Sequence, residues 1–254
     1  MSREYSEKQL AELQKIKTEV LCRKCNYAGY KDDKTLCDCM KKFIFIKELY
    51  FSEIPYEYWK FYLDEGLKEK LPSTIHLYCE RIPTAIEKGL GMILTSVKRG
   101  SGKTTAMAIA GKAGIILGKR VYYTFFQNII DDRFSENKDV EERIRNSDII
   151  LIDEVDKSVM KKDSPLKAHF EILIRSLASN KKSIIFATNG NDAEIGELFG
   201  MNEYFKGYFK LVSMFDENFR DTRKEKWDSA IKENQNYKNC VDMRDVEEFI
   251  KNRG

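Results

Sequence analysis

Residues 92–105 read Met-Ile-Leu-Thr-Ser-Val-Lys-Arg-Gly-Ser-Gly-Lys-Thr-Thr, an apolar stretch followed by a glycine-rich turn. The apolar residues predict a short strand, and the sequence after the turn predicts a helix. Gly100 and Gly102 let several backbone N–H groups point at one anion, and the helix adds the positive end of its dipole. The stretch therefore predicts a phosphate-binding loop. The residues expected to contact the nucleotide, ATP, are Lys98, Arg99, Gly100, Ser101, Gly102, Lys103, Thr104 and Thr105.

Two side chains of this loop have expected roles in chemistry. Lys103 can reach the β- and γ-phosphates, and the Thr104 hydroxyl can bind Mg²⁺. The full pattern G-x-x-x-x-G-K-[ST] has glycine at position 97, where this chain has Val97. The alternative is a glycine-rich turn before a core helix, but a loop between strand and helix favours phosphate binding.

A second apolar strand, residues 149–152, leads directly into Asp153 and Glu154. Ligands of open α/β folds bind where the carboxyl ends of the strands meet. Asp153 is therefore expected to hold Mg²⁺, and Glu154 to orient and deprotonate the water that attacks the γ-phosphate. Taken alone, an exposed strand end would also explain these two acids.

A third apolar strand, residues 183–188, is followed by Asn189 and Gly190. An amide at this point would lie between the phosphate loop and Glu154. Asn189 is therefore expected to sense the γ-phosphate or to hold the water, although Asn-Gly is also a common turn.

Helical stretches separate five strand candidates, which predicts an α/β fold whose parallel sheet is covered on both faces. The expected strands are residues 92–95, 121–126, 149–152, 183–188 and 211–215. Outside this core, helices are expected at residues 6–20, 40–50 and about 243–250.

Four of the six cysteines lie in one short window, at Cys22, Cys25, Cys37 and Cys39. Two close pairs can surround one tetrahedral ion with four thiolates, which predicts a Zn²⁺ site. Reduced thiols or a redox pair remain alternatives.

The overall composition fits a packed chain, with 42% hydrophobic and 33% charged residues. The net charge of +3 is too small to predict nucleic-acid binding from composition alone. No apolar run is long enough to span a bilayer, and the first residues do not resemble a signal peptide, so we expect a cytoplasmic protein without a membrane partner.

The order of these motifs resembles the DnaC/DnaI group of AAA+ helicase loaders, which includes the IstB transposition ATPases. The resemblance rests on the two cysteine pairs, Ile54-Pro55, Gly100–Thr104, Ile152–Glu154, Ala187–Asn189 and Phe215–Arg220. It implies ATP hydrolysis, a sheet in the order 5-1-4-3-2, self-association through the AAA+ domain, and contact with single-stranded DNA. It also implies a replicative hexameric DNA helicase as partner, gripped by the N-terminal module.

Three domains follow from this resemblance and the cysteine window: a helical zinc module at residues 1–50, the AAA+ ATPase domain at residues 51–223, and a charged tail at residues 224–254. Alternatives are an IstB-like transposition ATPase and a module that binds ATP with little hydrolysis.

The chain departs from the family pattern where an arginine finger is usual, just before the last strand. Residues 202–210 contain Lys206 and Lys210 but no arginine, and lysine lacks the planar fork of arginine. Arg220 is the best remaining candidate for a nucleotide-sensing role. Basic and aromatic residues alternate over residues 204–226, which fits either single-stranded DNA or an ordinary core with a solvated face.

Overall fold

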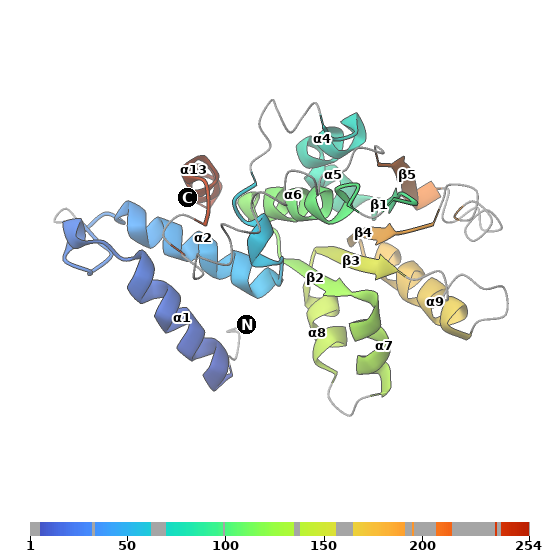
Figure 1. Ribbon diagram of the computed structural model, residues 1–254, viewed down its shortest axis with the longest axis horizontal. Helices are drawn as coiled ribbons and strands as arrows, with labels where there is room; N and C mark the ends of the chain where they lie inside the picture. Colours follow the sequence, from blue (N-terminus) through green and yellow to red (C-terminus); the bar gives the residue numbers. More distant parts are fainter. Residues whose placement is uncertain are drawn as a thin grey trace.

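The computed structural model describes residues 6–31, 34–61, 70–98, 100–134, 138–155, 165–190, 195, 207–214, 237 and 240–253. Five strands form one sheet at its centre (Figure 1). They are β1 (Gly91–Thr95), β2 (Val121–Phe125), β3 (Ile149–Val155), β4 (Ser183–Thr188) and β5 (Phe209–Ser213).

All neighbouring strands of the sheet run parallel, in the order β2-β3-β4-β1-β5. Read from the other edge, this is the order 5-1-4-3-2 that the family resemblance implies. Every residue of β1 and β4 is buried, as expected of central strands with helices on both faces. The predicted fold class is therefore confirmed.

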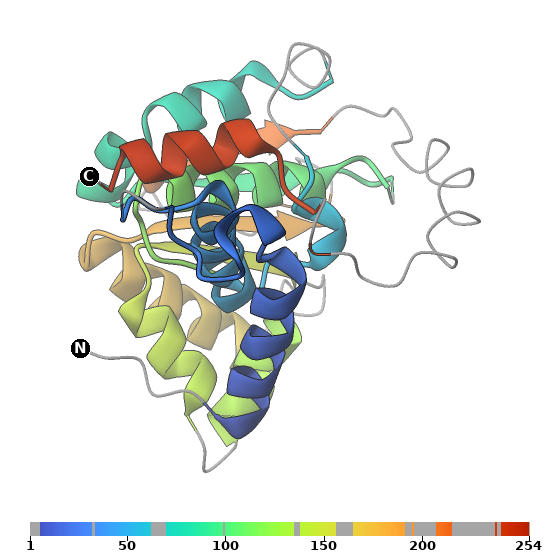
Figure 2. The ribbon, with the colours of Figure 1, turned by 90° about the vertical axis from the view of Figure 1, so that its left-hand side faces the viewer.

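Two layers of helices cover the sheet, one on each face (Figures 1 and 2). One layer contains α6 (Lys103–Ile116), α4 (Ser73–Glu80) and α5 (Ile82–Glu87). The other contains α7 (Phe126–Phe134), α8 (Asp139–Asn146) and α9 (Pro165–Ser179). Alternate residues of a strand point to opposite faces, so Tyr123 packs in the core on the α6 side and Tyr122 in the core on the other side.

The N-terminal part consists of α1 (Glu7–Val20), a 3-10 turn η1 (Arg23–Cys25) and α2 (Asp38–Ser52). Ser6 and Gln9 form a capping box at the start of α1: the Gln9 amide donates to Ser6 Oγ, and the Ser6 amide donates to Gln9 Oε1. The buried side of α2 packs against α6, β2 and the C-terminal helix α13 (Met243–Lys251). A second 3-10 turn, η2 (Tyr56–Tyr58), follows α2.

The C-terminal helix is part of the main hydrophobic core. Phe249 is fully buried, and its ring centroid lies 5.1 Å from that of Phe45 on α2. Lys112 of α6 forms a buried ion pair with Asp245 of α13, with Nζ and Oδ2 2.5 Å apart. The division into domains at residues 50 and 223 stays a prediction, but helices from both ends of the chain share one core with α6.

Four of the five strands differ from the predicted ranges: β1 begins one residue earlier, β2 ends one residue earlier, and β3 and β5 differ by two residues or more. β3 continues to Val155, so Asp153 and Glu154 lie inside the strand rather than after it. β5 begins at Phe209, so Lys210 lies within this edge strand. A run of apolar residues identifies a strand, but pairing with a neighbouring strand also extends it through polar residues such as Asp153, which pairs with Phe125 of β2. Among the described helices, none is long and apolar enough to cross a membrane.

Candidate functional site

The predicted phosphate loop connects β1 to α6 (Figure 1). Gly100 and Gly102 have φ angles of 84° and 85°, in the left-handed region that glycine adopts without strain. Gly102 precedes the first residue of α6, and no side chain caps this helix start. The first amides of α6 can therefore donate to an anion in the loop.

The polar residues of the loop differ in exposure. Ser101 is buried, whereas Lys98 and Val97 are exposed, and Arg99 lies outside the described residues. Val97 is 60% exposed, so a valine in place of the usual glycine costs no packing at this point. Thr105 is buried in the first turn of α6.

The Lys103 ammonium lies over the loop itself. Its Nζ donates to the Ser96 carbonyl at 3.3 Å, to Ser101 Oγ at 3.2 Å and to the Lys98 carbonyl at 3.5 Å. These distances are at the long end of the hydrogen-bond range, and the acceptors hold the ammonium over the loop.

The Asp153 carboxylate meets the loop at the carboxyl edge of the sheet. Thr104 Oγ1 donates to Asp153 Oδ2 at 2.8 Å. The two side chains that the sequence assigned to Mg²⁺ are therefore in direct contact, although β3 and the loop are far apart in the chain. A hydroxyl and a carboxylate are oxygen ligands of the kind that Mg²⁺ prefers.

Two further donors bind the same carboxylate. Tyr123 Oη donates to Asp153 Oδ2 at 2.8 Å, and the Glu154 amide donates to Oδ1 at 2.8 Å. Burial raises the pKa of Tyr123, and the charge of Asp153 raises it further, so the phenol stays protonated. No sequence motif marks Tyr123, although the alternation of residues along β2 places it on the same face as the other α6-side residues.

Glu154 adopts an unusual backbone conformation for a residue other than glycine, with φ 53°. The pairing of β3 with β4 is irregular between Ile152 and Val155, which brackets this residue. Such an irregularity turns one side chain out of the sheet. Glu154 is exposed while Asp153 beside it is buried, so one acid is held in place and the other faces the solvent at the mouth of the sheet.

Asn189 comes directly after β4, which lies between β1 and β3. The last residue of β4, Thr188, pairs with Thr95 of β1 on one side and with Val155 of β3 on the other. Asn189 is exposed there. Its position between the phosphate loop and Glu154 is the one expected from the sequence, whereas its role stays a prediction.

The candidates for arginine-finger and DNA-binding roles are only partly described. Lys206 and Arg220 lie outside the described residues, and Lys210 is exposed on β5. Phe209 is buried, with its ring centroid 5.7 Å from that of Phe186. Of the two alternatives for this stretch, the core therefore applies to Phe209.

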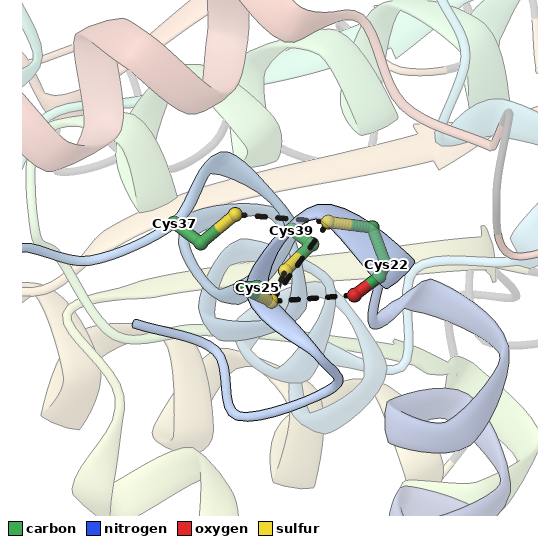
Figure 3. Close-up of side chains that lie close together, drawn as sticks. All are labelled: Cys22, Cys25, Cys37 and Cys39. Atoms are coloured by element: carbon green, nitrogen blue, oxygen red, sulfur yellow. Dashed lines mark hydrogen bonds between the residues drawn. The ribbon is translucent and has the colours of Figure 1, made fainter. Parts of the chain in front are cut away.

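The four clustered cysteines converge around one point (Figure 3). The Sγ atom of Cys22 lies 3.8 Å from Sγ of Cys25 and 3.7 Å from Sγ of Cys37. The Sγ atoms of Cys25 and Cys39 are 3.5 Å apart. All four lie within 4.8 Å of one another. Zn–S bonds of about 2.3 Å in a tetrahedron place neighbouring sulfurs about 3.8 Å apart, whereas a disulfide needs about 2.0 Å. The spacing therefore fits a zinc ion, and these four cysteines form no disulfide in this structure.

The surroundings shift the pKa values of two of these thiols in opposite directions. Burial raises the pKa of Cys25, but hydrogen bonds from the Gly29 amide and the neighbouring thiols lower it to about 7. Burial raises the pKa of Cys39. One thiol thus ionises readily and another resists ionising, and a divalent cation favours the thiolate form of all four.

No family model matches the sequence. Among curated proteins, the chain is similar to the chromosomal replication initiator protein DnaA of Campylobacter jejuni subsp. jejuni, with 30% identity over 115 residues. The match covers 43% of this chain and 25% of that protein, so the chain spans about a quarter of the length of these relatives.

Two solved structures are similar to this chain over part of its length. The DnaC helicase loader gives a TM-score of 0.44 at 17% identity, over 56% of this chain and 87% of that chain. AMPPCP-bound DnaA from Aquifex aeolicus gives a TM-score of 0.41 at 21% identity, over 79% of this chain and 65% of that chain. Its own sheet order and the position of the phosphate-loop motif directly after β1 therefore give this chain a parallel α/β architecture with a candidate phosphate site, and the chain is similar to DnaA and DnaC over part of its length.

Proposed function

We propose that this chain is an ATPase that uses ATP and Mg²⁺ to load a replicative DNA helicase during the initiation of DNA replication. The contact between Thr104 and Asp153 carries the nucleotide part of this proposal, because it joins the phosphate loop to the acid expected to hold the metal. The helicase part rests on the resemblance of the motif order to the DnaC/DnaI group. The similarity to the replication initiator DnaA supports a role in replication.

Each residue of the site has a separate role in binding or hydrolysing ATP. The amides from Gly100 to Thr104 and the Lys103 ammonium bind the phosphates. Thr104 and Asp153 would hold Mg²⁺, which supplies positive charge against the phosphate oxygens. Glu154 orients the attacking water and accepts its proton, and Asn189 holds that water or senses the γ-phosphate.

The partners of the chain are also part of the proposal. The zinc module around Cys22 to Cys39 grips the helicase, the AAA+ domain associates with copies of itself, and single-stranded DNA binds the assembly. Arg220 serves as nucleotide sensor. The protein acts in the cytoplasm, and its N-terminal zinc module, ATPase domain and C-terminal tail divide near residues 50 and 223.

Two variants test the nucleotide part. Lys103→Ala should weaken binding of a fluorescent ATP analogue, and unchanged affinity would contradict the phosphate loop. Glu154→Gln should bind ATP normally but release phosphate at least about 100-fold more slowly. Co-purification of the full-length chain with the replicative helicase of its host tests the helicase part, and failure of the zinc-loaded chain to retain the helicase would contradict it.

A second candidate is a module that binds ATP and hydrolyses little of it. It is favoured by the absence of arginine from residues 202–210, where the family resemblance implies an arginine finger. In that case the wild-type chain would show no turnover for the Glu154→Gln substitution to remove. An IstB-like transposition ATPase would instead co-purify with a transposase and bind duplex DNA.

A further inference from the structure

Asp153 receives hydrogen bonds at both carboxylate oxygens. Thr104 Oγ1 and Tyr123 Oη both donate to Oδ2, and the Glu154 amide donates to Oδ1, each at 2.8 Å. Asp153 is only 5% exposed, so these donors replace most of the water that would solvate its charge.

The three donors are not equivalent. The Glu154 amide belongs to the same strand and cannot leave the carboxylate without a change in β3. The Thr104 hydroxyl is the group that the proposed function assigns to the metal. Tyr123 is thus the one side-chain donor among these three that comes from outside the predicted metal site.

The surroundings of the Tyr123 side chain fix its orientation. It is 3% exposed, on the α6 face of β2, and its ring meets the Phe125 ring edge-on with centroids 5.6 Å apart. A buried phenol needs a hydrogen-bond acceptor, and Asp153 Oδ2 supplies it. The tyrosine and the aspartate therefore restrict each other's rotation.

We infer that Tyr123 is a positioning residue of the magnesium site: its hydroxyl holds the Asp153 carboxylate in the orientation in which it faces Thr104. This inference rests on the proposed function, in which Thr104 and Asp153 bind the metal. With the Tyr123 hydroxyl present, Oδ1 and Oδ2 are both anchored independently of Thr104. Without it, only the Glu154 amide holds the carboxylate when Thr104 moves toward a ligand, so Oδ2 is no longer fixed.

The test is the Mg²⁺ dependence of nucleotide binding by full-length Tyr123→Phe. A fluorescent ATP analogue is titrated at increasing Mg²⁺ concentration and again in EDTA. Loss of a group that orients a metal ligand costs about 10-fold or more in metal affinity, so the half-saturating Mg²⁺ concentration should rise about 10-fold. Binding in EDTA should stay unchanged, because the phosphate amides are untouched.

Tyr122→Phe is the matched control, since Tyr122 is the neighbouring residue, is equally buried at 3% exposed, and faces the opposite core. It removes the same hydroxyl and should leave the Mg²⁺ titration at its wild-type position. In an Asp153→Asn background, Tyr123→Phe should add no further change, because it acts through that carboxylate.

The outcomes separate the inference from the proposed function. If nucleotide binding by the wild-type chain does not depend on Mg²⁺, the proposed function is contradicted, whatever Tyr123→Phe does. A Mg²⁺-dependent wild type with an unchanged titration for Tyr123→Phe would overturn the positioning role. The role is equally overturned if Tyr123→Phe weakens binding in EDTA as much as in Mg²⁺, since that is general damage to the fold.

Discussion

The buried ion pair between Lys112 and Asp245 joins the helix of the phosphate loop to the C-terminal helix. Their side chains are only 5% and 2% exposed. Lys112 Nζ also donates to the backbone carbonyls of Trp59 and Phe61. Burial lowers the pKa of Lys112 and raises that of Asp245, and in each case the partner's charge opposes the shift. Both groups therefore depend on each other to remain charged.

The loss of stability on substitution depends on which buried charges and carbonyls are left without a partner. Lys112→Met leaves a buried carboxylate and two carbonyls without their donor, and Asp245→Leu leaves a buried ammonium. Each single substitution should lower the free energy of unfolding by about 3–5 kcal/mol. In the double variant no charge remains, and only the two carbonyls lose a partner, at about 1 kcal/mol each. The double variant should therefore lose about 2 kcal/mol, far less than the sum of the single losses.

Urea unfolding followed by circular dichroism measures these differences, with nucleotide absent and zinc held constant so that ligand binding does not contribute. The exposed pair between Arg145 and Glu141 provides the control. Glu141→Gln should change stability by only about 0.3–0.5 kcal/mol. If the double variant loses as much as the two single variants together, the two charges do not interact and this reasoning is wrong.

Three further predictions concern other parts of the chain. Cys39→Ser should reduce bound zinc from about one ion per purified chain to almost none by elemental analysis, and full retention would contradict the four-thiolate site. Asp242→Ala should cost about 1 kcal/mol in urea unfolding, because the Asp242 side chain accepts from the Arg244 amide at the start of α13. The Arg244 side chain lowers the pKa of Asp242, so this stabilisation is complete above its unfolded pKa of about 3.9 and disappears as the pH falls through the lower folded pKa. A loss that persisted at still lower pH would argue against the cap. Phe249→Ala should cost about 3–5 kcal/mol and expose α13 to limited proteolysis, whereas wild-type resistance would show that this helix is not needed by the core.

Most of the nucleotide site could be predicted because its parts are local in the sequence. The glycines of the loop, the lysine and the threonine occupy adjacent positions, and the acids follow an apolar strand. The cysteine cluster was predictable for the same reason, since ligand spacing within two short loops determines which sulfurs can meet. The order of the sheet came from the family resemblance and not from the residues themselves.

Other features depended on how distant segments pair. The unusual backbone at Glu154 arises where β3 and β4 lose regular pairing, and no local pattern marks it. The burial of Phe209 follows from the addition of β5 beside β1, which turns a stretch of aromatic and basic residues into an edge strand with one face in the core.

The sequence by itself thus predicted the kind of ligand at each candidate site, because phosphate and zinc are recognised by residue types at short and regular spacing. Only the tertiary structure decided which side chains support those ligands. Tyr123 reaches Asp153, and Asp245 reaches Lys112, through strand register and helix packing. Such neighbours are selected by the geometry of the whole core, which periodicity along one segment does not contain.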